Sequence, residues 1–150
     1  MSDQARGSAL HVAKATRLPM RAVDRVEVET GRGIVGDRYH GTKHRHVTVQ
    51  SQEALDEAAE VYGRPVPVEL TRRNVTVTGG AVPRTPGARL RLGPVLLEGV
   101  RVAAPCKLLD DTIGVGAQEA LRRRAGSVCR VLEGGELELG AAYAVEHDPA

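Results

Sequence analysis

The residue best suited to chemistry in this sequence is Cys106, which lies between Pro105 and Lys107. Pro105 fixes its own φ and favours an extended backbone at Ala104, so we expect the thiol at a defined bend. Lys107 supplies a neighbouring cation, which favours the thiolate, the form of cysteine that attacks electrophiles and binds metals. A small, buried and inert cysteine is the alternative interpretation of the local sequence.

Cys129 and the N-terminal segment indicate the cellular compartment in which the protein is expected. Two cysteines do not make a disulfide framework in a chain of 150 residues. Cys129 shares a face with Val131 in an expected strand, so we interpret it as a core residue. The segment from Met1 to Arg6 is polar, and no apolar run follows it, so we expect no secretory signal. These features predict a cytoplasmic protein with reduced thiols, and no stretch is long enough to predict a membrane span.

A second candidate region is the glycine-rich stretch at residues 31–41, GRGIVGDRYHG. Its four glycines indicate unusual backbone angles or close approach to another group. It lacks the Gly-Lys-Ser/Thr of a P-loop, and no helix is expected after it, as a dinucleotide fingerprint requires. A turn needs Gly and Asp but not Arg and His, so we predict that Arg38 and His40 face a ligand. A solvated loop is the alternative.

Three histidines, His40, His44 and His46, lie close together in the sequence, and the last two share one face of an extended segment. Their spacing matches no defined metal motif. The basic neighbours that would repel a dication are Arg38, Lys43 and Arg45. The sequence therefore favours surface or anion-binding histidines over a metal site.

Arginines near two further elements are candidates for anion binding. Arg72 and Arg73 precede an expected strand, and the forked donors of arginine suit phosphate. Asn74 follows them, and its amide could read the edge of a heteroaromatic ring. Arg124 ends a run of three arginines in an expected helix, where a phosphate contact is one role. The alternatives are an exposed basic turn for the first group and a favourable interaction with the helix dipole for the second.

The composition is that of an ordinary folded protein and argues against one class of partner. Hydrophobic residues make up 41% of the chain and charged residues 27%, which does not indicate disorder. The formal net charge is only +2, and the aromatic residues are three Tyr, with no Phe or Trp. A basic barrel that binds nucleic acid through residues 38–46 is therefore the weakest hypothesis, since single strands need aromatic stacking platforms.

The apolar patterns predict many short strands and two helices. Strands are expected at residues 10–15, 23–29, 46–50, 75–77, 88–92, 95–100, 127–132, 136–139 and 141–146. Ser51 can cap a helix over residues 52–62 that Gly63 ends, and a second helix is expected over residues 116–124. Residues 1–8 are expected to form a flexible tail before a single domain at 9–150. The sum is an α/β, mainly β fold: a closed or nearly closed β-barrel with two or more short helices at its rim.

Several stretches taken in order resemble a MOSC domain, the domain found at the C-terminus of molybdenum cofactor sulfurases. They are GIVGDR at 33–38, VTV at 47–49 before the Ser-capped helix, RRNV at 72–75, the hairpin at 90–93, PC at 105–106, Gly126 and GGELELG at 134–140. The resemblance spans about Leu10 to Val145 and is to the small stand-alone bacterial members. No single motif is specific, so the ordered set carries it. One departure is Ala142, where many members have Asp after Gly.

The resemblance implies a β-barrel-like α/β fold, a functional cysteine at Cys106 and binding of a molybdopterin-type molybdenum cofactor. It maps an Arg-x-Asn-like element of the family onto Arg72, Arg73 and Asn74. Some relatives reduce N-hydroxylated bases or amidoximes, with molybdenum held by a protein cysteine, and others handle sulfur for the cofactor. The chain lacks the pyridoxal-phosphate desulfurase domain of the sulfurases, so we do not expect it to generate persulfide by that route.

Two main hypotheses follow from the resemblance. In the first, the chain is an enzyme that reduces small N-hydroxylated substrates, with Cys106 as the catalytic metal ligand and an outside reductase as electron donor. The expected cofactor-binding residues are Arg38, His40, Arg72, Arg73, Asn74, Lys107 and Arg124. In the second, the chain is a carrier that holds sulfur as a Cys106 persulfide, or holds the cofactor, for a partner protein. Exposed strand edges of a small barrel would also allow a homodimer.

Overall fold

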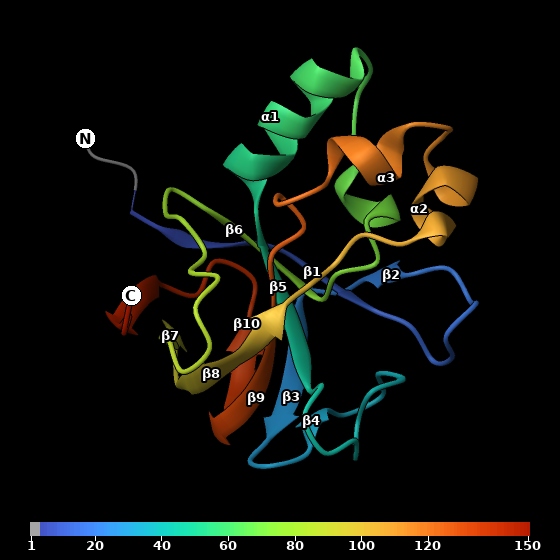
Figure 1. The fold of residues 1–150 in the computed structure, drawn as a ribbon. Coiled ribbons are helices and arrows are strands. Elements are labelled where there is room, and N and C mark those ends of the chain that lie inside the picture. Colours follow the sequence, from blue (N-terminus) through green and yellow to red (C-terminus); the bar gives the residue numbers. More distant parts are fainter. Residues whose placement is uncertain (1–3) are drawn as a thin grey trace.

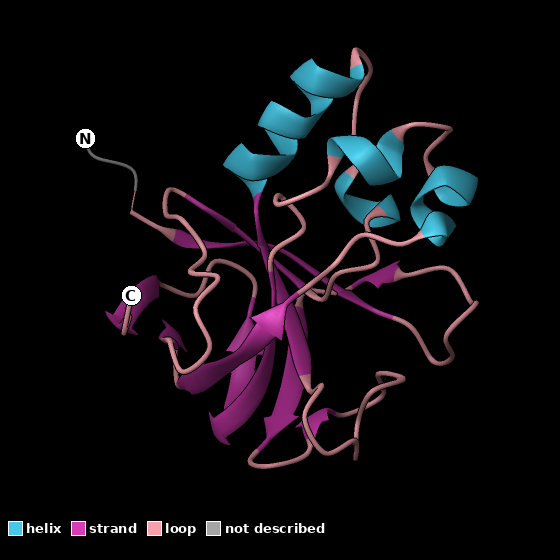
Figure 2. Ribbon diagram, in the orientation of Figure 1, coloured by secondary structure: helices cyan, strands magenta, loops and turns pink. Residues whose placement is uncertain are grey.

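The structure is a computed structural model that describes residues 4–150, and most of its regular elements are strands (Figures 1 and 2). The strands are β1 (Arg6–Val12), β2 (Arg21–Ala22), β3 (Arg25–Glu29), β4 (Gly33–Ile34), β5 (Val47–Ser51), β6 (Val75–Thr78), β7 (Arg89–Leu92), β8 (Val95–Val102), β9 (Ser127–Glu133), β10 (Gly135–Glu138) and β11 (Tyr143–His147). The helices are α1 (Gln52–Tyr62), α2 (Lys107–Thr112), α3 (Ala117–Ala120) and the 3-10 turn η1 (Val68–Leu70). The helices gather at one end of the strands (Figure 2).

The larger sheet has eight strands in the order β11-β7-β8-β9-β5-β6-β1-β2, and a second sheet has the order β10-β3-β4. Among the strands described within residues 4–150, β5 and β6 form the one parallel pair. Helix α1 lies in the connection between them. The two ends of the large sheet meet near Gly7, whose N–H donates to Ala141 O at 2.9 Å, and through an isolated bridge between Arg6 and Ala142. The mainly β prediction is confirmed. Neither described sheet is closed by a continuous ladder of strands, so the structure supports a nearly closed barrel at most.

Aliphatic side chains fill the interior between the two sheets, as expected for a chain without Phe or Trp. The main core includes Leu10, Val49, Val75, Leu97 and Leu137, each at most 3% exposed. A smaller core lies beneath the helices and consists of Leu55, Ala58, Val66, Leu109 and Leu121. The helices therefore have an apolar cluster of their own beside the main core between the sheets.

Two elements agree closely with the sequence prediction. Helix α1 begins after Ser51, whose side chain accepts a hydrogen bond from Ala54 N at 3.2 Å. It ends at Gly63, which adopts the left-handed conformation with φ 77°. The β7–β8 hairpin also forms, with Leu92 opposite Val95. Both elements are set by local signals, a cap and a turn, which a sequence displays directly.

Three local predictions differ from the structure. Strand β1 begins at Arg6 and pairs with β6, so the predicted tail is wrong from that residue onward; residues 1–3 lie outside the described part. Helix α2 occupies a segment for which the sequence patterns predicted no helix, and it forms because Leu109 packs into the smaller core. Helix α3 is only Ala117–Ala120 rather than 116–124, and Arg123 leaves helical geometry with φ 66°. That residues 9–150 form one domain stays a prediction.

None of the helices within residues 4–150 combines the length and apolar character needed to cross a membrane.

Candidate functional site

The turn between β8 and α2 presents Cys106 at the surface. Cys106 is the exposed free cysteine, with an extended backbone (φ −127°, ψ 169°), and it directly precedes α2. Lys107, also exposed, is the first residue of the helix. Cys129 is wholly buried, and burial raises the pKa of its thiol to about 12. The interpretation of Cys129 as a core residue is confirmed, and Cys106 is the thiol within reach of other molecules.

Four arginines from three separate segments lie together, and we call them the arginine cluster: Arg38, Arg45, Arg72 and Arg73. Arg73 connects the cluster to Ala104, two residues before Cys106. Their mutual closeness is visible in their electrostatics. Burial lowers the pKa of Arg73 to about 10, and repulsion from Arg45 is the next largest cause. Burial and then repulsion from Arg38 lower the pKa of Arg72. A charged Cys106 would act in the opposite direction and raise the pKa of both Arg72 and Arg73, as a smaller cause than burial.

Arg73 ties the Cys106 turn to the segment after α3. Its side chain is buried, with Nε donating to Ala125 O at 2.9 Å and Nη2 donating to Ala104 O at 3.2 Å. Ala104 lies two residues before Cys106. The Arg73 fork therefore holds the backbone that leads into the cysteine, a structural task that the sequence did not reveal.

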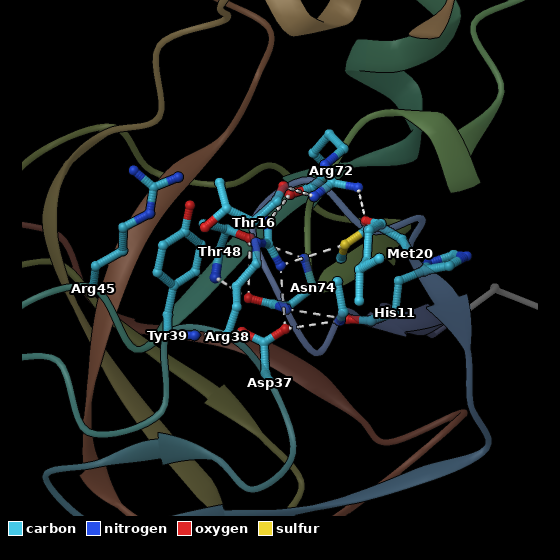
Figure 3. A network of polar contacts seen from close by, with 12 residues as sticks. His11, Thr16, Met20, Asp37, Arg38, Tyr39, Arg45, Thr48, Arg72 and Asn74 are labelled. Atoms are coloured by element: carbon cyan, nitrogen blue, oxygen red, sulfur yellow. Dashed lines mark hydrogen bonds and ion pairs between the residues drawn. The ribbon is translucent and has the colours of Figure 1, made fainter.

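Arg72 organises the loop that follows β1. Its two terminal nitrogens donate to the carbonyls of Leu18 and Thr16. Figure 3 shows Arg72 beside Thr16. Its backbone has φ 67°, a left-handed conformation that is uncommon outside glycine. Arg72 O in turn accepts from Arg38 Nη2 at 3.2 Å. In this conformation the Arg72 side chain binds the loop after β1, while the Arg72 carbonyl accepts from Arg38.

The ring of Tyr39 lies between Arg38 and Arg45 (Figure 3). The Cζ atoms of the two arginines are 4.4 Å and 4.2 Å from the ring centroid, a cation–π distance. Asp37 anchors this stack by accepting from Arg38 Nη1 at 3.2 Å and from Ala13 N at 3.1 Å. The glycine-rich stretch at 31–41 therefore contributes a charged residue, Arg38, and an aromatic residue, Tyr39, to the arginine cluster.

The arginine cluster carries more positive charge than its contacts neutralise. Among the described residues, Asp37 is the one carboxylate that forms an ion pair with a cluster arginine, and it contacts Arg38 alone. The Nε atoms of Arg38 and Arg45 are buried and have no hydrogen-bond partner within residues 4–150. Buried donors without acceptors are costly, and an anion would satisfy them. The arrangement can therefore bind an anionic group beside an exposed thiol.

Three of the predicted site residues do not face the arginine cluster. Asn74 is 1% exposed, and both ends of its amide are bonded within the protein, so it has no free surface for a ligand. His40 bonds through Nε2 to Glu29 Oε1. Arg124 makes an ion pair of 3.5 Å with Glu57 of α1. Of the predicted set, Arg38, Arg72 and Arg73 lie together, Arg73 bonds to the backbone two residues before Cys106, and Lys107 is the exposed residue that follows Cys106.

The histidines form no metal site in the described structure. His46 is buried, where Nε2 donates to Thr42 O at 2.8 Å and Nδ1 accepts from Val131 N at 3.0 Å. His44 is exposed. Within residues 4–150 no group of three or more His, Cys, Asp or Glu side chains is placed to hold a metal ion. A metal at Cys106 would therefore need ligands from outside the protein.

Sequence reasoning missed Tyr39 and Arg45 as members of the site. Arg45 was weighed only as a cation that would repel a metal, and Tyr39 only as part of the glycine-rich stretch. The usable signal was the Asp-Arg-Tyr run at 37–39, which combines an anchor, a cation and a ring. The stack on Arg45 arises from the loop that folds back before β5, which no local pattern displays.

Comparisons with known proteins support one family. The family model described as "MOSC domain" matches residues 36–144. The YuaD protein from Bacillus subtilis has a similar crystal structure, with a TM-score of 0.80 and 21% sequence identity over 94% of each chain. YiiM from Geobacillus stearothermophilus gives a TM-score of 0.73 at 19% identity, covering 95% of this chain and 75% of that one. YiiM from Escherichia coli gives 0.67 at 15% identity, over 95% of this chain and 71% of that one. No curated protein sequence matches this chain.

Proposed function

This chain belongs to the MOSC domain family, and we propose that it binds a molybdopterin-type molybdenum cofactor with Cys106 as the metal ligand. The observation that carries the proposal is the exposed thiol beside a cationic cluster whose contacts leave positive charge unneutralised. The pterin phosphate of such a cofactor is an anion, and forked guanidinium donors suit phosphate. The residues present therefore fit the group that the family implies.

The pKa of Arg73 indicates how much a bound anion could stabilise the protein. Its pKa falls from 12.5 to about 10 in a side chain that is almost fully buried. A difference of that size means that charged Arg73 destabilises the fold by about 3 kcal/mol at neutral pH. An anion beside Arg73 would offset part of this cost, because it favours the charged form. Binding of the cofactor phosphate is thus expected to stabilise the protein.

We assign the residues separate tasks. Cys106 supplies the sulfur ligand, and the exposed Lys107 next to it adds positive charge to the site. The free Nε donors of Arg38 and Arg45 hold the phosphate, and Tyr39 keeps these two arginines apart at a fixed spacing. Arg72 and Arg73 hold the surrounding loops with most of their donors and contribute charge to the same anion. The bound cofactor would supply two-electron redox chemistry at molybdenum.

The proposed reaction is reduction of an N–O bond in a small N-hydroxylated substrate. Two electrons from an outside reductase and two protons convert the N–OH group to N–H and water. The exposed position of Cys106 allows a small substrate to approach the metal that it would hold.

Turnover of a hydroxylamine-type base by cofactor-loaded protein tests this proposed reaction. We expect Cys106→Ala to remain folded and to lose turnover, with Arg122→Ala, an exposed arginine paired with Glu119 outside the arginine cluster, as control. Unchanged turnover in Cys106→Ala would refute the proposal.

A second candidate function is a sulfur or cofactor carrier, which the same exposed thiol favours. In this case Cys106 would hold a persulfide for a partner protein and perform no reaction alone. Mass spectrometry after loading by a cysteine desulfurase is the discriminating measurement. A sulfane-sulfur adduct on Cys106 supports the carrier, and an unmodified thiol after demonstrated desulfurase activity counts against it.

A further inference from the structure

A cavity of about 420 Å³ lies at the start of α1, and no residue of the arginine cluster lines it. Its walls come from three elements: the first turns of α1, the loop after β6 and the segment after α3. In Figure 1 the start of α1 lies near both the loop after β6 and the segment that follows α3. The volume falls in the range of sites that hold small organic ligands.

The charged residues of this cavity are three arginines and two glutamates, which leaves one positive charge in excess. Both glutamates are engaged, since Glu53 Oε1 accepts from Gly79 N at 3.0 Å and Glu57 pairs with Arg124 at 3.5 Å. Arg84 and Arg123 line the cavity, and neither has an ion pair or side-chain hydrogen bond within residues 4–150. Two guanidinium forks are therefore available for a ligand.

Two features of the segment after α3 suit it to a binding role. Arg123 has φ 66°, and a left-handed arginine is an uncommon conformation that functional sites often retain. Arg124 also lines the cavity, and its buried Nε atom has one partner among the described residues, Glu57 Oε2 in an ion pair of 3.5 Å. The next residue, Ala125, gives its carbonyl to Arg73, so this segment borders both the cavity and the arginine cluster without sharing a lining side chain.

We propose that this cavity binds a small organic anion. Arg84 and Arg123 would hold its phosphate or carboxylate group, because both groups match the fork of a guanidinium. The apolar body of the ligand would lie against Ala54, Ala81 and Val82. The N-terminus of α1 adds a partial positive charge to the same wall. This site is separate from the proposed cofactor site and does not depend on Cys106.

Titration of the whole protein by NMR tests the proposal, with phenyl phosphate, benzoate and neutral benzyl alcohol as probes. We expect one or both anions to shift the backbone amides of Gly79 and Gly80, and the alcohol to leave them unchanged. Phenyl phosphate alone would identify phosphomonoesters, and benzoate alone would identify carboxylates. Arg84→Gln should weaken binding about tenfold or more, as loss of a charge-assisted pair implies. Arg123→Gly should do the same, and it keeps the left-handed backbone.

Arg122→Gln and Cys106→Ser are the controls. Arg122 is the neighbouring exposed arginine, pairs with Glu119 and does not line the cavity. Both controls should bind the probes as the wild type does, which separates this site from the one at Cys106. The proposal is overturned if neither anion shifts Gly79 and Gly80 at millimolar concentration, if the shifts occur only near Cys106, or if Arg84→Gln and Arg123→Gly bind as tightly as Arg122→Gln.

Discussion

Replacing Asn74 with alanine should destabilise the protein strongly even when no ligand is present. The side chain is 1% exposed, and its Oδ1 accepts from Thr48 N at 3.1 Å and from Thr48 Oγ1 at 3.2 Å. Its Nδ2 donates to His11 O at 3.1 Å. The amide thus connects β6 with both of its neighbouring strands, β5 and β1.

The magnitude follows from these contacts. The substitution Asn74→Ala removes three hydrogen bonds, each of which contributes about 1 kcal/mol net. It also leaves a Thr48 N–H and a His11 carbonyl buried without this partner, which adds a desolvation cost. The expected loss in the free energy of unfolding is about 3–5 kcal/mol. With a urea dependence of about 2 kcal/mol per molar, the unfolding midpoint should fall by about 2 M.

Urea unfolding of the apo protein at pH 7, followed by circular dichroism, measures this effect. Gln52→Ala is a matched control, because it removes an exposed amide bonded to Asp56 and should change the free energy of unfolding by less than about 0.5 kcal/mol. A midpoint for Asn74→Ala that equals that of the control would refute the structural role. Asn74 would then be a candidate for ligand contact after all.

Three further outcomes are expected. Iodoacetamide at pH 7.5 should modify Cys106 and spare Cys129 in the native protein, because burial raises the Cys129 pKa to about 12; mass spectrometry showing equal labelling would contradict this. Gly126→Ala should abolish folding or lower the melting temperature sharply, since its Cβ would lie 2.0 Å from Val49 O; a melting temperature within a few degrees of wild type would contradict it. Burial lowers the pKa of His11, so the unfolded state binds the proton more tightly than the folded state. The free energy of unfolding should therefore fall as the pH drops below about 6.5. In His11→Gln the urea unfolding midpoint should change less between pH 7 and pH 5 than it does in the wild type.

The sequence predicted elements whose signals are local. Helix α1 has its serine cap and its terminal glycine within one segment, and the β7–β8 hairpin has its turn between two alternating strands. Helix α2 has six residues, too few for an apolar period, and it forms because Leu109 packs against residues of α1 and against Leu121, which caps α3. Tertiary packing, rather than intrinsic helix propensity, decides such short elements.

The candidate site was predicted in part for the same reason. Cys106 and Arg38 stand out because their neighbours in sequence are unusual. The stack of Tyr39 on Arg45 depends on how a loop returns to the barrel, and sequence spacing does not contain that information. Asn74 was interpreted as a ligand contact from its residue type alone. The structure shows that its side chain is buried and that its amide is hydrogen-bonded within the protein.

The central claim is that Cys106 and the arginine cluster hold a molybdenum cofactor, and the molybdenum and pterin content of the purified protein tests it most directly. The wild type and Cys106→Ala should be prepared from a host that makes the cofactor and that loads a control molybdoenzyme in parallel. We predict metal and pterin in stoichiometric amounts in the wild type, and loss of the metal in Cys106→Ala. Wild-type protein without either component, from a host whose control enzyme is fully loaded, would contradict the account.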